Sequence, residues 1–120
     1  MIMRILLVLA LVLGLGIAGA RAHAFLDHAN PAVGSRLTAA PAEVRLWFTT
    51  ALEPAFSSLK VVDAAGHPVD LGDGKVDGAD PSLLKATLKP LPSGTYKVIW
   101  RVVSVDTHVT EGDFNFRVGS

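Results

Sequence analysis

The sequence predicts an all-β sandwich of the immunoglobulin-like class with about seven strands, and three observations support this fold. Apolar and polar residues alternate with a period of two in several short segments. Turn-forming residues recur between these segments, at the spacing of roughly 8–12 residues that is typical of sandwiches and small barrels. After residue 22, no segment sustains an apolar stripe of period 3.6 over three helical turns, so helices are not expected.

Five segments are strand candidates because of their alternation or their content of branched apolar residues. In chain order they are 44–48, 59–62, 83–88, 96–102 and 114–118. In the first of them, Val44, Leu46 and Phe48 share one face, which predicts the side that packs into the core. Glycine, proline and aspartate cluster between the candidates, and we expect residues 72–80 to form an exposed polar loop.

The first 22 residues have the pattern of a cleaved export signal. A basic Arg4 precedes an apolar run over residues 5–17, and Ala20-Arg21-Ala22 matches a small-x-small cleavage site. The alternative is a retained membrane anchor, but the apolar stretch is shorter than the roughly 20 residues that a spanning helix needs. We therefore expect cleavage after Ala22, a periplasmic location, and one domain over residues 23–120 with no membrane span.

The composition of the predicted mature chain excludes several classes of site. Its 98 residues carry nine basic and eleven acidic side chains, and this balance of −2 offers no basic patch for nucleic acid. There is no cysteine, and both methionines lie within the first three residues. The predicted mature chain therefore has no disulfide, no thiolate and no sulfur ligand for a soft metal ion.

The predicted cleavage would create a metal-binding N-terminus at His23. A terminal histidine offers both its free α-amine and its ring nitrogen to one ion. Asp106 and His108 lie two residues apart, so in an extended segment both side chains leave the same face and can converge. We interpret His23, Asp106 and His108 as the ligands of one copper(II) ion per chain. Nitrogen and oxygen donors suit tetragonal copper(II), although zinc accepts the same donors and remains an alternative.

Several motifs of the chain resemble the CopC family of periplasmic copper-resistance proteins. The matching stretches are His23-Ala24, Asn30-Pro31-Ala32-x-Gly34-Ser35, Tyr96-Lys97-Val98-x-Trp100, Ser104-Val105-Asp106-Thr107-His108 and Phe114-x-Phe116-x-Val118-Gly119. The resemblance implies a seven-stranded Greek-key sandwich, immunoglobulin-like or cupredoxin-like in layout. It also implies a carrier that holds copper(II) through His23, Asp106 and His108, and a CopD-type inner-membrane protein as partner.

The chain departs from the family pattern in two places. Some members carry a methionine-rich loop that binds copper(I), and the corresponding stretch here contains no methionine, so that second site is expected to be missing. Many members carry a glutamate where this chain has Thr50, so that carboxylate is lost unless Glu53 substitutes for it.

Two other functions remain as alternatives to a copper carrier. A terminal-histidine copper chelate is also the core of the lytic polysaccharide monooxygenases, so a copper redox enzyme is one of them. The other is an immunoglobulin-like interaction module without a metal. We expect no enzyme, because no catalytic constellation accompanies the site. His28, a rival ligand, and Glu111 and Asp113, which could orient His108, are the additional residues weighed for the site.

Overall fold

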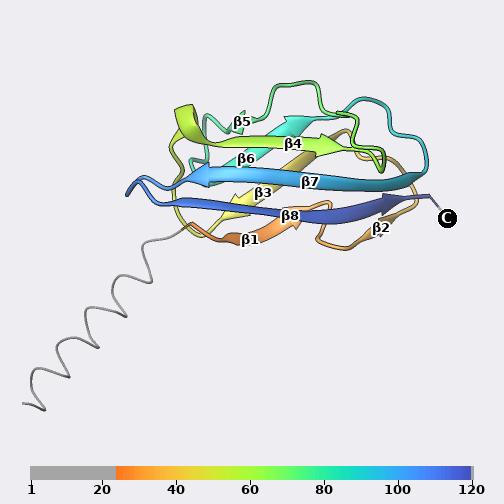
Figure 1. The fold of residues 1–120 in the computed structure, drawn as a ribbon. Helices are drawn as coiled ribbons and strands as arrows, with labels where there is room; N and C mark the ends of the chain where they lie inside the picture. Colours follow the sequence, from red (N-terminus) through yellow and green to blue (C-terminus); the bar gives the residue numbers. More distant parts are fainter. Residues whose placement is uncertain (1–23, 120) are drawn as a thin grey trace, which may run out of the picture.

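The computed structural model describes residues 24–119, which form a sandwich of two four-stranded sheets (Figure 1). The predicted signal peptide and His23 lie outside the described residues. The strands are β1 (Leu26–Asn30), β2 (Arg36–Leu37), β3 (Glu43–Phe48), β4 (Ser58–Val62), β5 (Lys75–Val76), β6 (Leu83–Thr87), β7 (Gly94–Val103) and β8 (Val109–Val118). One short 3-10 turn, η1 (Pro54–Phe56), precedes β4. The predicted all-β sandwich is confirmed.

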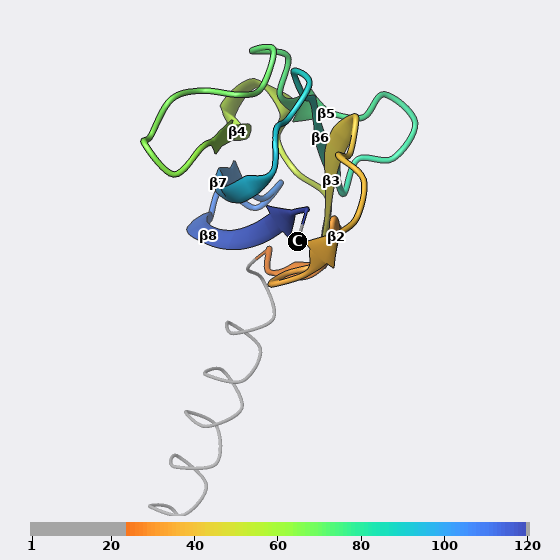
Figure 2. The same cartoon turned by 90° about the vertical axis from the view of Figure 1, so that its right-hand side faces the viewer.

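The two sheets have the strand orders β1-β3-β6-β5 and β2-β8-β7-β4. Seen from one end, the sheets face each other across the core (Figure 2). All neighbouring strands are antiparallel except β2 and β8, which are parallel. The longest pairing joins β7 and β8 over ten residue pairs, from Gly94–Val118 to Val103–Val109. This long hairpin holds the β7–β8 turn at one end of the sandwich.

The core follows the predicted alternation. Val44, Leu46 and Phe48 of β3 are at most 4% exposed, as the sequence pattern predicted. The inward-facing residues of the opposite sheet are Val61 of β4, Tyr96, Val98 and Val102 of β7, and Phe114, Phe116 and Val118 of β8. The Tyr96 hydroxyl donates a hydrogen bond of 2.5 Å to the Pro92 carbonyl, so this buried aromatic ring keeps a partner for its polar end.

Residues 24–119 contain eight strands where the sequence predicted about seven, and three of them lie outside the five candidate segments. The strands β2 and β5 are only two residues long, too short for alternation to appear. The expected polar loop over residues 72–80 is partly wrong, because it contains β5, whose Val76 is buried. Strand β1 has mostly exposed or half-buried side chains, so it lacks a clear apolar face.

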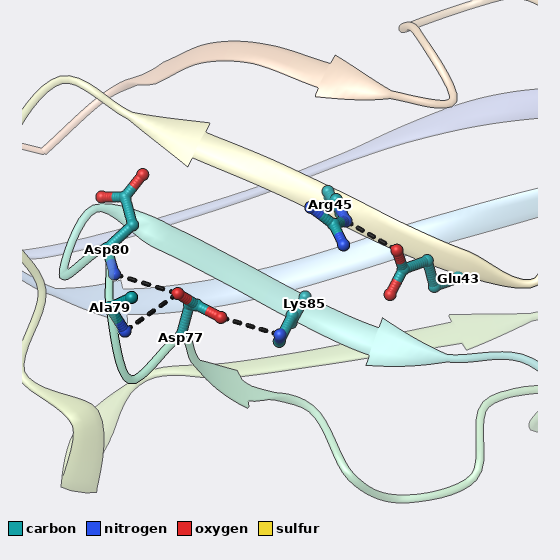
Figure 3. A network of polar contacts seen from close by, with 6 residues as sticks. All are labelled: Glu43, Arg45, Asp77, Ala79, Asp80 and Lys85. Atoms are coloured by element: carbon teal, nitrogen blue, oxygen red, sulfur yellow. Dashed lines mark hydrogen bonds and ion pairs between the residues drawn. The ribbon is translucent and has the colours of Figure 1, made fainter.

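The connection between β5 and β6 is ordered by one carboxylate. Asp77 accepts backbone hydrogen bonds from Ala79 and Asp80 and forms a 2.7 Å ion pair with Lys85 (Figure 3). These donors, led by the hydrogen bond from Lys85, lower the pKa of Asp77 from 3.8 to about 2. On the same sheet, Arg45 pairs with Glu43 at 2.6 Å.

Candidate metal centre

The predicted ligands Asp106 and His108 lie in the turn that joins β7 to β8. Backbone hydrogen bonds close this turn: the N–H of Ser104 donates to the His108 carbonyl at 2.9 Å, and the N–H of Thr107 donates to the Ser104 carbonyl at 2.8 Å. Thr107 has a φ of 73°, in the left-handed region. The segment is therefore not extended, so the condition under which the spacing alone would align the two side chains is not met.

The turn nevertheless brings the two predicted side chains together. Nδ1 of His108 lies 3.1 Å from Oδ2 of Asp106, and both side chains are partly exposed at the end of the sandwich. The same turn positions a third polar group, Ser104, whose hydroxyl donates a hydrogen bond to Oδ1 of Asp106. Ser104 is fully buried, and its hydroxyl also lies 3.3 Å from the backbone N–H of His108. One buried hydroxyl thus contacts both residues of the pair.

The hydrogen bond from Ser104 is the largest influence on the Asp106 carboxylate. It lowers the pKa of Asp106 below 3.8, and the hydrogen bond from His108 acts in the same direction, whereas desolvation opposes them. Asp106 is therefore ionised at neutral pH. An anionic oxygen beside an imidazole nitrogen is a suitable pair of donors for a divalent transition-metal ion.

The start of the described chain is fixed at the same end of the sandwich (Figure 1). Ala24 is fully buried, and its carbonyl accepts a 2.7 Å hydrogen bond from the hydroxyl of Thr110, two residues beyond His108. Phe25 forms two hydrogen bonds with Thr49: its N–H donates to Oγ1 at 3.0 Å, and its carbonyl accepts from the Thr49 N–H at 2.8 Å. The segment just before β1 is therefore attached to both sheets beside the β7–β8 turn.

The other residues weighed from the sequence have different surroundings. Glu111 forms a 3.0 Å ion pair with Arg101 across the β7–β8 ladder, and Asp113 lies opposite Ile99 further along it. The backbone N–H of Glu53 donates to the Val103 carbonyl beside the turn. Within residues 24–119, no three side chains of His, Cys, Asp or Glu are grouped closely enough to hold a metal ion. The predicted third ligand, His23, lies outside this range.

Sequence reasoning missed three hydroxyl residues that organise this end of the molecule. Thr49 and Thr110 hold the segment before β1, and Ser104 holds the Asp106 side chain. Ser104 belongs to the Ser104–His108 stretch that resembles the family, but serine and threonine are common on exposed strands and turns, so residue type alone did not indicate the contacts of these three residues. Their roles depend on contacts between segments that are far apart in the chain.

Comparison with known proteins identifies the family. The model of the CopC domain matches residues 26–119. The chain belongs to the CopC family. Copper resistance protein C of Pseudomonas syringae pv. tomato is 40% identical over 105 residues, covering 82% of each chain. The similarity therefore extends over more than four fifths of each of the two proteins.

Solved structures of two relatives agree with the fold. The crystal structure of CopC from Methylosinus trichosporium OB3b superposes with a TM-score of 0.74 at 35% identity, covering 80% of this chain and 93% of that one. PcoC from Escherichia coli, a methionine-rich copper resistance protein, gives a TM-score of 0.70 at 36% identity over 81% and 99% of the two chains. Among the described residues of this CopC protein, no helix is long and apolar enough to cross a membrane.

Proposed function

We propose that this CopC protein is a periplasmic copper(II) carrier or buffer that serves copper homeostasis or resistance. Copper(II) is its cargo, one ion per chain, held by the α-amine and imidazole of His23 together with Asp106 and His108. The observation that carries this proposal is the convergence of two distant segments at one end of the sandwich: the anchored residues 24 and 25, and the Asp106–His108 pair.

The anchoring of Ala24 limits where His23 can lie. Consecutive Cα atoms are 3.8 Å apart across a trans peptide, so His23 starts within one residue of a carbonyl that Thr110 holds. Thr110 is itself two residues from His108. These short steps support a common site, because one residue separates His23 from the bonded carbonyl and two residues separate Thr110 from His108.

The donor set favours copper(II) as the ion. Three nitrogens and one carboxylate oxygen suit its tetragonal geometry, and copper stands at the top of the divalent affinity series. The chain after Met3 lacks the sulfur ligands that copper(I) prefers, in contrast to the methionine-rich relative PcoC. The names of both copper-resistance relatives agree with copper as the cargo.

A carrier fits the site better than an enzyme does. An ionised Asp106 in the coordination sphere favours the oxidised ion, whereas a redox enzyme must cycle its copper.

Three exposed apolar side chains, Phe25, Val105 and Val109, border the site and offer a contact surface to a protein that takes the ion. We propose a CopD-type inner-membrane protein as that partner. Export through the cleaved signal, with a domain over 23–120, completes the proposal.

One added residue tests the proposed site. Two chains would be compared in a copper(II) titration against a strong chelator, one beginning at His23 and one carrying a single alanine before it. The added alanine places the free α-amine one residue away from the imidazole of His23, so the two groups no longer form one chelate. The sandwich and the β7–β8 turn stay intact. Tight binding by the first chain alone is expected. Equal binding by both would exclude the terminal amine as a ligand, and no binding by either would exclude the carrier.

A further inference from the structure

A second carboxylate–imidazole pair lies on β1, at the free edge of the β1-β3-β6-β5 sheet. Nδ1 of His28 is 2.7 Å from Oδ2 of Asp27. The same two atom types are 3.1 Å apart in the His108–Asp106 pair. The His28 and Asp27 side chains are 60% and 61% exposed, so solvent and ions have access to both.

A β-bulge explains how two consecutive residues come to share one face of the strand. Successive side chains normally alternate between faces, but the register of β1 against β3 shifts between Leu26 and His28. Leu26 and Ala29 both pack against the core, so the two residues between them face outward together. The bulge therefore positions the Asp27 carboxylate beside the His28 ring.

The ring of His28 is also held from its face. It stacks on the Trp47 indole with ring centroids 4.5 Å apart and an interplanar angle of 9°. His28 and Trp47 are paired across β1 and β3, so both rings stand side by side on the outward surface of the sheet. The stack and the carboxylate together restrict the rotation of the imidazole, which lowers the entropy that a bound ligand would have to remove.

We propose that Asp27 and His28 form a second, weaker copper(II) site on the edge strand. Two neighbouring ligands with metal bonds of about 2.0 Å at a right angle lie about 2.8 Å apart, close to the spacing of this pair. The ion takes the place of the hydrogen bond between Nδ1 and the carboxylate: the shared proton moves to Nε2 or to solvent, the exposed carboxylate turns so that both lone pairs face the ion, and water completes its coordination. No third side chain of His, Cys, Asp or Glu joins the pair among residues 24–119, so the ion exchanges rapidly.

The remaining described histidine provides a matched control. His67 also has an aspartate neighbour, but its Nδ1 is 3.5 Å from Oδ2 of Asp63 and its side chain is 77% exposed. The other oxygen of Asp63 accepts backbone hydrogen bonds from Ala65 and His67, so this carboxylate orders a turn. His67 thus reproduces the exposure and the charge of the second site without its close donor spacing.

Copper(II) titration followed by NMR tests the second site on the chain that begins at His23. Paramagnetic copper broadens the amide signals of nearby residues. Once one equivalent has bound, further copper is expected to broaden the signals of Asp27, His28 and Trp47 selectively. The variant His28→Asn should weaken this second event at least about tenfold, since losing a ligand costs no less than losing a residue that orients one. The variant His67→Asn should leave the event unchanged.

The result is independent of the copper site proposed at His23. In the variant His108→Ala the tight event should disappear while the broadening around His28 persists. Two outcomes overturn the second site: broadening of these signals that survives His28→Asn, or its absence with a tenfold excess of copper. A second readout is the fluorescence of Trp47 in the variant Trp100→Phe, where Trp47 is the sole tryptophan. Its quenching should require His28.

Discussion

Ser104 shows how much a single buried hydroxyl can determine at this site. It is fully buried, donates a hydrogen bond to Asp106, and accepts from the backbone N–H of His108. Its own backbone N–H and carbonyl close the turn. The main chain and the side chain of Ser104 both form hydrogen bonds within residues 104–108. These hydrogen bonds hold Asp106 and His108 in fixed positions relative to each other.

We expect Ser104→Ala to weaken copper(II) binding about tenfold to a hundredfold, because groups that orient metal ligands typically contribute this much. The measurement is chelator competition together with the copper(II) EPR spectrum, which should change as Asp106 loses its fixed orientation. Ser57→Ala is the matched control: Ser57 is also buried and accepts the Val103 N–H at 3.2 Å, but it does not contact Asp106. Equal losses in the two variants would mean that Ser104 acts through stability alone.

At the scale of the element, alternation was sufficient to find the long strands and insufficient for the short or bulged ones. β3 buries every second residue along its whole length, β7 does so at three positions, and β8 does so from Phe114 onward, which is the pattern that the sequence displays. In β1 the bulge interrupts that pattern, and β5 is too short to display it. The sequence predicted that Asp106 and His108 converge, and argued this for the case of an extended segment. In the structure, a turn with Thr107 in the left-handed conformation brings the two side chains together. No local residue pattern predicts that conformation.

The β5–β6 connection should make stability depend on pH. The pKa of Asp77 is about 2 in the folded chain and 3.8 ordinarily, so its contribution is complete above about pH 5 and is lost as the pH falls towards 2. We expect Asp77→Asn to lower the melting temperature at pH 7, and this difference from the unmodified chain should shrink between pH 4 and pH 2. Asp113→Asn, on the exposed face of β8, is the control. Parallel melting curves over this range would contradict the assignment.

Strand β8 contains a position where only glycine fits. A Cβ on Gly112 would overlap the indole of Trp100, which lies opposite on β7 and packs edge-on against Phe48 with centroids 5.2 Å apart. We expect Gly112→Ala to destabilise the fold by about 1–3 kcal/mol, the usual cost of overpacking a core. Urea unfolding measures it. Gly78→Ala is the control: its Cβ would meet open space, so it should change the midpoint of urea unfolding little. Equal midpoints for the two variants would show that the Trp100 ring moves aside freely.

For the whole molecule, the core and the candidate metal centre are separate parts. The buried cluster draws on both sheets and contains apolar side chains, while the Asp106–His108 pair lies at one end, outside that cluster. The turn that carries the pair is closed by its own backbone hydrogen bonds. Folding therefore rests on burial of apolar surface, which needs no metal, in contrast to small domains whose core is completed by zinc.

Removal of copper should accordingly leave the sandwich folded. In the chelator-treated chain we expect an unchanged far-ultraviolet circular dichroism spectrum and a cooperative melt. Relative to the chain loaded with one equivalent of copper, NMR changes should be confined to residues 23–25 and 104–110. Free copper at one hundred times its dissociation constant should then stabilise the fold by about 2.7 kcal/mol, because it binds the native state alone. Loss of cooperative melting on chelation would contradict the separation of the core from the candidate metal centre. The ion would then be a structural element of the fold, rather than a cargo that the folded sandwich binds and releases.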